Sequence, residues 1–280
     1  MSTNPTLYHR ITERLLELMK AGQLPWLRPW NSGPGVSGLP RNGATGRPYS
    51  GVNVLILWAS GRPDARWYTF RQAQAANGQV RRGEKGSEVL FFKLLEKADP
   101  KTGEDVGIPI ARSFHVFNHD QIDWPDAGAS EPPTEVHLDA QNLIRESGAS
   151  IVHGGDQACY QPLRDVITMP AYGSFKTPEG YFATALHELA HWTGHPSRLN
   201  RKAGVFGTEE YAFEELVAEI SAAFSAAHCG LPAQDTHHAA YLQSWVTLLS
   251  KDPKAIVRAS KLAREATEHL LGRRAEATAA

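Results

Sequence analysis

The sequence predicts an α+β protein: a small antiparallel sheet with helices in its N-terminal half, and a mainly helical C-terminal half. Apolar residues recur at helical spacing near the N-terminus and in four long stretches after residue 178. Residues 87–96 and 110–118 instead have the composition of two paired strands. A segment rich in Pro, Ala, Ser and Gly separates the two patterns. We therefore expect domains at residues 1–125 and 135–280, joined by a linker at 126–134.

The individual elements follow from their start and stop signals. Residues 7–21 form an amphipathic helix that ends at Gly22, and Thr69 caps a short helix that stops at Gly78. The segment 52–60 is consistent with either a short helix or a buried strand. Beyond the linker we expect one helix, then short strands, then four helices, at about residues 136–148, 149–155, 158–170, 178–194, 208–229, 233–250 and 253–272.

The composition limits the class of protein. Only two cysteines occur, Cys159 and Cys229, so neither a disulfide framework nor a cysteine zinc site is expected, and a reducing cytoplasm suits them. The N-terminal segment is amphipathic and lacks the apolar core of a signal peptide. No apolar run approaches the roughly 18 residues that cross a bilayer, so we expect no membrane partner.

Charge is distributed unevenly along the chain. Residues 1–93 contain 13 Lys and Arg against 5 Asp and Glu, whereas the remainder contains 16 against 25. Cations alternate with aromatic residues in the basic half, which suits single-stranded nucleic acid because cations follow phosphates and rings stack on unpaired bases. The alternative is that the tryptophans form core. The predicted contact residues are Trp26, Arg28, Trp30, Arg41, Arg47, Trp67, Arg71, Arg81, Arg82 and Lys85.

The clearest chemical motif is HELAH at residues 187–191. On a helix, His187 and His191 lie one turn apart on the same face, where both imidazoles reach one ion. Glu188 lies beside them, positioned to take a proton from a water held by that ion. Thr177, a helix cap, and Pro178, in the first turn, support the helix. The alternative is a surface helix whose histidines and glutamate are incidental.

A third ligand is expected from the next helix, EEYAFEELVAEISAAF. It offers Glu214, Glu215 and Glu219. Three protein ligands leave one position for water, which is typical of a catalytic zinc site, although a structural metal is the alternative. Thermolysin-like zinc peptidases have a similar E-x-x-x-D/E pair, and this resemblance favours Glu215 as the ligand and Glu219 as the support of a histidine. Glu214 is the rival ligand. We expect one Zn²⁺ per chain, with other divalent metals possible.

Longer phrases carry a family resemblance. The run from LPWLRPW through WYTFRQAQAANGQVRRGEKG to FHVFNHDQI resembles the N-terminal domain of ArdC-type antirestriction proteins, which also begins certain plasmid primases. The phrase HELAHWTGHPSRLNR with FGTEEYAFEELVAEISAAF resembles the metallopeptidase-like domain of the same family. The similarity extends from about residue 7 to about residue 250.

This resemblance implies a protein of conjugative plasmids or phages that acts in the cytoplasm of a bacterial host or recipient cell. It implies single-stranded DNA binding by the N-terminal domain, protection of incoming DNA from restriction, and a zincin-like domain of the gluzincin type. The metal motif carries over to His187, Glu188, His191 and Glu215. A host restriction or regulatory protein is a possible peptidase substrate. The oxyanion-stabilising residue stays open among Tyr172, Tyr181, Tyr211 and His195.

Two other hypotheses remain from the sequence. In one, the protein only binds DNA, and its metal site is structural or regulatory. In the other, the protein is a metalloprotease whose N-terminal domain recognises protein.

Overall fold

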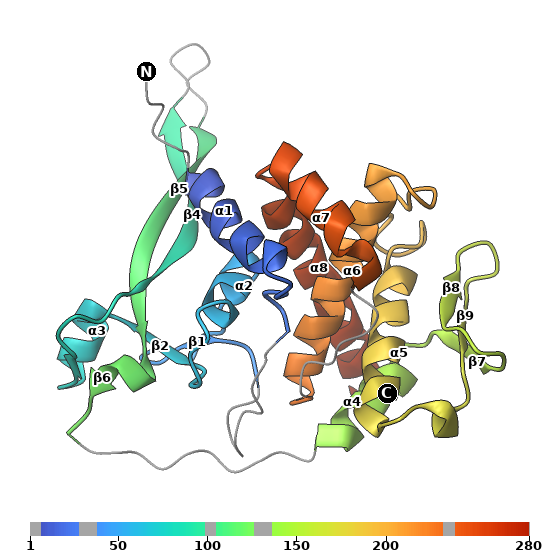
Figure 1. Ribbon diagram of the computed structural model, residues 1–280. Helices are drawn as coiled ribbons and strands as arrows, with labels where there is room; N and C mark the ends of the chain where they lie inside the picture. The colour runs from blue at the N-terminus through green and yellow to red at the C-terminus, as the bar shows by residue number, and fades with distance from the viewer. Residues whose placement is uncertain (1–6, 28–37, 99–104, 126–135, 232–238, 280) are drawn as a thin grey trace.

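The structure, a computed structural model, describes residues 7–27, 38–98, 105–125, 136–231 and 239–279 (Figure 1). Its α+β architecture confirms the predicted fold class. The N-terminal part contains α1 (Leu7–Lys20), β1 (Arg41–Asn42), α2 (Val52–Trp58), β2 (Arg66–Thr69), α3 (Phe70–Ala75), β3 (Gln79–Val80), β4 (Ser87–Ala98), β5 (Asp105–Asn118), the 3-10 turn η1 (His119–Gln121) and β6 (Ile122–Asp123). The C-terminal part contains α4 (Val136–Glu146), β7 (Ser150–His153), β8 (Cys159–Gln161), β9 (Val166–Met169), the 3-10 turn η2 (Tyr172–Ser174), α5 (Pro178–Thr193), α6 (Glu209–His228), α7 (Ala239–Lys251) and α8 (Ala255–Ala279).

The N-terminal sheet has the strand order β1-β2-β5-β4, and the long antiparallel pair of β4 and β5 dominates it. This pair confirms the antiparallel strands predicted from the sequence. The segment that the sequence left ambiguous is the helix α2. Its Asn53 side chain donates to the Leu90 carbonyl and accepts from the Leu90 amide, each at 2.7 Å. These two bonds satisfy the outward-facing backbone groups of Leu90, so the helix covers part of a strand edge that would otherwise be open.

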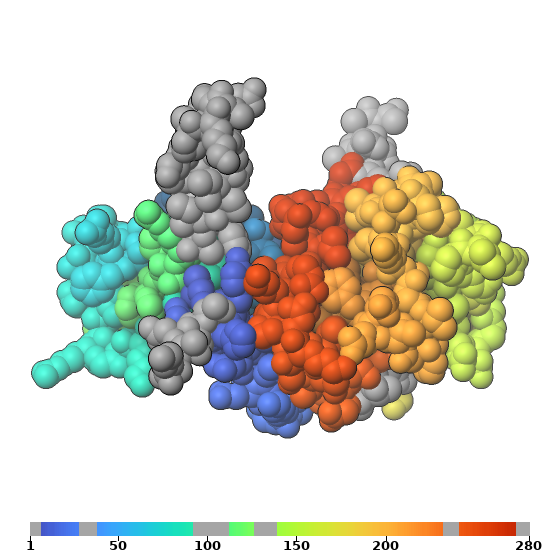
Figure 2. Space-filling model, turned by 90° about the horizontal axis from the view of Figure 1, so that it is seen from above, coloured from blue at the N-terminus to red at the C-terminus, as the bar shows by residue number. Residues whose placement is uncertain are grey.

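One hydrophobic core joins the two halves of the chain. It combines apolar residues of α1 and α2 with apolar residues of α6, α7 and α8. Trp26 packs edge-on against Trp245 at 5.5 Å between ring centroids, and Trp58 packs against Phe224 at 5.8 Å. In Figure 2 the blue N-terminal helix lies directly against the red C-terminal helices. The predicted domain division stays a prediction, and the two segments are packed together.

The C-terminal half is built around three helices and a small sheet. Helices α5 and α6 pack side by side, α8 packs against both, and the sheet β7-β9-β8 flanks α5 (Figure 1). Both cysteines are free thiols, Cys159 exposed and Cys229 buried. In the described part of the chain, no helix has both the length and the apolar character needed to span a bilayer.

Candidate metal centre and nucleic-acid interface

Helix α5 presents the two motif histidines to a common point. The helix starts at the Thr177 cap, whose hydroxyl accepts from the Gly180 amide, with Pro178 in the first turn as predicted. His187 and His191 lie one turn apart, and their Nε2 atoms approach to 3.1 Å. Two nitrogens at this distance cannot both point a proton at the other, so at least one lone pair faces the space between them.

Helix α6 adds a carboxylate at the same point. The Oε2 atom of Glu215 lies 3.6 Å from His187 Nε2, and its Oε1 atom lies 3.5 Å from His191 Nε2. One ligand atom from each of these three residues fits within 4.8 Å of the others. The structure thus brings together the three side chains that the sequence predicted as ligands.

Two further glutamates stand behind the histidines. Glu219 Oε1 lies 3.3 Å from His187 Nδ1, and Glu214 Oε1 lies 3.4 Å from His191 Nδ1. A carboxylate at Nδ1 keeps the proton on that nitrogen and turns the Nε2 lone pair toward the centre. Glu219 lies on the side of His187 where the sequence predicted a supporting carboxylate, and its contact with Nδ1 is an ion pair rather than a hydrogen bond. Glu214, the rival ligand, supports the other histidine instead.

Arg201 anchors Glu214, and the sequence analysis missed this contact. Its guanidinium donates to both Glu214 carboxylate oxygens, at 2.7 and 3.0 Å, and also to the Thr193 hydroxyl and the Ala190 carbonyl. The arginine therefore both neutralises the carboxylate and caps the C-terminal carbonyls of α5. Gly194 leaves room for it, since a Cβ atom there would lie 3.0 Å from Arg201 Nη2. These contacts explain Thr193, Gly194 and Arg201 within the phrase HWTGHPSRLNR.

The electrostatics of the cluster suit a cation. Burial lowers the pKa of each histidine, but the facing carboxylates raise it by a larger amount. As a result, the pKa of His187 is raised well above 6.5, and that of His191 is raised to about 9. Burial raises the pKa of Glu215, but its bonds to the two histidines hold it well below its usual value. In the metal-free protein, protonated imidazole thus balances the buried carboxylate. Two imidazoles and one carboxylate, each side chain less than a fifth exposed, form a donor set that fits a divalent metal such as zinc.

Glu188 lies beside this cluster and is held by a backbone group. The Tyr160 amide in β8 donates to Glu188 Oε2 at 2.7 Å, and the residue is 8% exposed. Strand β8 is fixed in turn, because Asp165 binds both the Tyr160 hydroxyl, at 2.8 Å, and Arg198, at 2.5 and 2.9 Å. Residue identities carry no signal for a backbone donor. The Tyr160 amide thus fixes the orientation of the Glu188 carboxylate.

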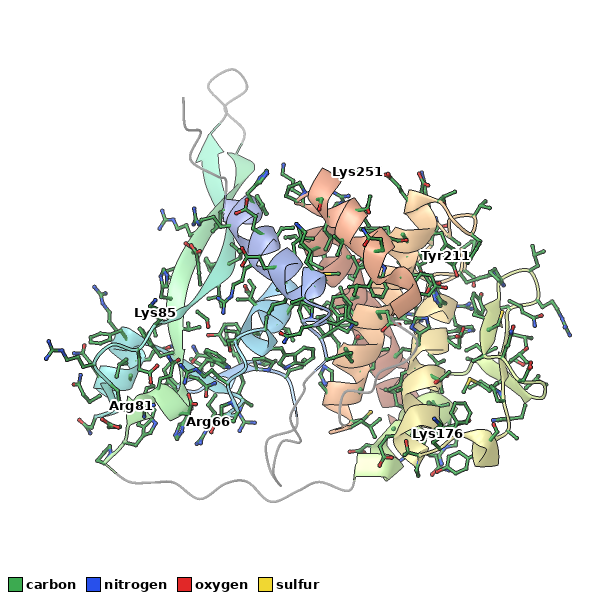
Figure 3. The ribbon with its side chains drawn as sticks, viewed as in Figure 1. Arg66, Arg81, Lys85, Lys176, Tyr211 and Lys251 are labelled. Carbon is green, nitrogen blue, oxygen red and sulfur yellow. The ribbon has the colours of Figure 1, made fainter. Side chains whose placement is uncertain are left out.

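Among the tyrosines left open by the sequence, Tyr211 contacts the cluster. Burial raises its pKa first, and hydrogen bonds to Tyr241 and to the Glu215 carboxylate raise it further. The Tyr211 and Tyr241 hydroxyls are 3.2 Å apart, and both rings line a cavity of about 280 Å³. Tyr181 instead bonds His153 at 3.0 Å. Figure 3 shows Tyr211 in the C-terminal half of the molecule, together with Lys176 and Lys251.

The predicted nucleic-acid contacts need a correction for the tryptophans. Trp26 and Trp67 are each 1% exposed, Trp26 against Trp245 and Trp67 among Leu57, Val89 and Val116. Neither ring has a free face for a base, so both are removed from the predicted interface. Packing overrides the amphipathic character that tryptophan has at interfaces. Arg28 and Trp30 lie outside the described residues.

The predicted arginines and lysine fall into two groups. Arg81 pairs with Glu84 at 3.0 Å, so part of its charge is engaged within the protein. Arg41 is half-buried in β1 and has contacts of its own. The others are exposed, and among the described residues none of them forms a salt bridge: Arg47, Arg71, Arg82 and Lys85. Figure 3 shows Lys85 and Arg81 at the end of the molecule away from the C-terminal helices.

Comparison with known proteins agrees with this architecture. Residues 5–117 match the model for the N-terminal domain of the anti-restriction factor ArdC, and residues 138–262 match that for a zincin-like metallopeptidase. The metal-free crystal structure of the antirestriction protein ArdC from plasmid R388 has 36% sequence identity and a TM-score of 0.84, and the similarity covers 97% of this chain and 99% of that one. The chain belongs to the ArdC-type antirestriction family.

Other relatives place this ArdC-type chain in a wider group. The Mn(II)-bound structure of the same R388 protein superposes with a TM-score of 0.80. The protein y4eC of Sinorhizobium fredii is 33% identical over 98% of this chain and 94% of its own length. Two DNA primases TraC of Escherichia coli are 42% and 39% identical. The chain spans 27% and 20% of those primases, so it corresponds to one part of them.

Proposed function

We propose that this chain is an antirestriction factor that binds single-stranded DNA through its N-terminal half and carries a zinc metallopeptidase-type centre in its C-terminal half. It would protect incoming DNA from host restriction in the cytoplasm of a bacterial host or recipient cell. The observation that carries the proposal is the cluster of His187, His191 and Glu215 beside Glu188, in a member of the ArdC-type family. Arg47, Arg71, Arg82 and Lys85, which are exposed and form no salt bridge in the described part of the chain, support the DNA-binding part.

One Zn²⁺ would be held by His187, His191 and Glu215. The Mn(II)-bound relative supports a divalent metal in this family, and the imidazole-rich donor set of this cluster favours zinc. A bound zinc ion would supply Lewis-acid chemistry and make water acidic enough to lose a proton near neutral pH.

The chain's own residues would supply the proton transfer and the orientation. Glu188 would accept a proton at its carboxylate and return it to the leaving amine. The Tyr160 amide would hold that carboxylate in one rotamer during the exchange. Tyr211 would donate its hydroxyl proton in a hydrogen bond to the carbonyl oxygen under attack, since it already lies beside Glu215. A host restriction or regulatory protein is the proposed substrate class.

The DNA-binding part is tested by titrating labelled single-stranded and duplex oligonucleotides over a series of salt concentrations. Tighter binding to the single strand, with affinity falling as salt rises, is expected from phosphate contacts. Equal and salt-insensitive binding would contradict the proposal and favour an N-terminal half that recognises protein.

The hydrolytic part is tested with Glu188→Gln, which removes the proton acceptor and leaves the three proposed ligands. Metal analysis should show wild-type metal content, and a plasmid-transfer assay against a restricting host should show loss of protection. Full protection by this variant would show that the metal has a structural or regulatory role without hydrolysis. His187→Ala serves as the metal-deficient control.

A further inference from the structure

The burial of Trp26 and Trp67 leaves open which rings meet the DNA. Among the described N-terminal residues, three phenylalanines are exposed: Phe70 (44%), Phe91 (48%) and Phe114 (46%). An aromatic ring that is almost half exposed still has a face that a flat partner can cover. Since single-stranded DNA offers unpaired base faces, these rings are the candidates for stacking. This step rests on the proposed function.

Phe70 is held rigidly at the surface. It is the first residue of α3, directly after Thr69, whose hydroxyl accepts from the Gln72 amide while the Gln72 side chain accepts from the Thr69 amide. The ring packs at 6.4 Å and 65° against Phe117 of β5, which supports it from one side. A ring fixed in this way loses little conformational freedom when a base stacks on it.

Exposed cations occur on the segments next to Phe70 and next to Phe117. Arg71 follows Phe70 directly in the chain. Gly86, at the end of the loop that carries Arg82 and Lys85, lies against Phe117, because a Cβ atom at Gly86 would be 3.2 Å from the Phe117 ring. Arg71, Arg82 and Lys85 are exposed, without salt bridges in the described part of the chain.

The backbone of this loop is open as well. Gly83 has a φ of +88°, and a Cβ atom there would meet no heavy atom within 4 Å. A phosphate can therefore approach the loop backbone between the two cations.

The other two exposed phenylalanines, Phe91 and Phe114, have surroundings that suit DNA binding less well. Phe91 and Phe114 cover each other at 5.8 Å between centroids. The strand register places two cations beside them: Arg112, the partner of Phe91 across the β4–β5 ladder, and Lys93, two residues after Phe91 on the same face of β4. Val89, opposite Phe114, is buried. This pair therefore combines aromatic surface with less charge than the Phe70 region has.

We propose that Phe70 is the base-stacking residue of the single-stranded DNA site, and that Arg71, Arg82 and Lys85 hold the phosphates next to the stacked base. The site takes an unpaired nucleotide of any sequence, because each base offers a stacking face and none of these groups reads base edges. Phe117 acts as the backing that keeps Phe70 in place.

The experiment compares Phe70→Ala with Phe91→Ala, which removes an equally exposed ring and so serves as the matched control. The probe is a labelled oligodeoxythymidine, and binding is followed by fluorescence anisotropy. Phe70→Ala should weaken binding by roughly ten-fold, Phe91→Ala should leave it within about two-fold, and Phe70→Trp should restore it. Circular dichroism of each variant checks folding.

The outcomes separate this proposal from the one on which it rests. Wild-type affinity in Phe70→Ala, or a larger loss in Phe91→Ala, overturns the assignment of Phe70 while DNA binding stands. Failure of the wild-type protein to bind the oligonucleotide overturns the proposed function itself. A photo-crosslink from 5-iodouracil DNA to the peptide that contains Phe70, found by mass spectrometry, supports the assignment independently.

Discussion

The metal centre and the basic surface use charge in opposite ways. At the centre, each histidine has one nitrogen toward the common point and one toward a supporting glutamate, and Arg201 fixes one of those glutamates. At the surface, Arg82 and Lys85 extend into solvent without ionic partners in the described part of the chain. The first arrangement is pre-organised for one small ion, whereas the second leaves cations free to follow a flexible polymer.

The largest expected effect is the removal of a proposed ligand. Glu215→Ala should lower the affinity for zinc by more than the roughly 10- to 100-fold expected when a supporting carboxylate is lost. Glu219→Gln, which keeps all three proposed ligands, is the control and should stay within that smaller range. Competition with a chromogenic chelator measures both. Equal losses in the two variants would show that Glu215 has no special role at the centre.

Truncation of a buried tryptophan should affect folding rather than DNA contacts. Trp67→Ala removes a ring from the cluster with Leu57, Val89 and Val116, at an expected cost of about 3–5 kcal/mol in the free energy of unfolding. Urea denaturation gives this value, and titration with DNA at low temperature gives the affinity of the folded fraction. A loss of DNA affinity with unchanged stability would restore Trp67 to the interface.

The stability of the metal-free protein should depend on pH through the histidines. Burial lowers the pKa of His191, but Glu214 and Glu215 raise it, with a net value of about 9 in the folded protein. This value is above the unfolded value of about 6.5, so the stabilisation is complete below pH 6.5 and is lost as the pH rises toward 9, by up to about 3 kcal/mol.

Bound zinc should reverse this trend, since protons compete with the metal for the same nitrogens. Melting temperatures of the metal-free and zinc-loaded protein between pH 6 and 9 should therefore diverge as the pH rises. Parallel curves would show that the metal binds elsewhere.

The smallest expected effect concerns single phosphate contacts. Arg82→Gln and Lys85→Gln should each reduce the slope of log affinity against log salt by about 0.7 for single-stranded DNA. Arg164→Gln, an exposed cation on the β8–β9 turn, is the control and should leave the slope unchanged. A uniform change in all three variants would indicate a diffuse effect of net charge.

The sequence could predict the histidine pair because its geometry is local, whereas the choice of Glu215 over Glu214 rests on the resemblance to thermolysin-like peptidases. The spacing in HELAH and in EELVAE sets which side chains share a helix face, whatever the rest of the chain does. Which side chains are available to nucleic acid depends instead on contacts between residues far apart in the sequence. Arg62 forms an ion pair with Asp120, and Trp67 is buried under α2 and β4. The hold on Glu188 comes from the Tyr160 amide, and a backbone donor leaves no trace in residue identity.

The joint core has a consequence for any attempt to study the parts of this molecule alone. Helix α6 supplies Glu215 to the proposed metal site and also places Phe224 against Trp58 of α2. Separating the two parts by a cut within residues 126–134 would expose the apolar face of α6 that packs against α2. The isolated C-terminal fragment should then aggregate in water. Each part therefore buries an apolar surface of the other.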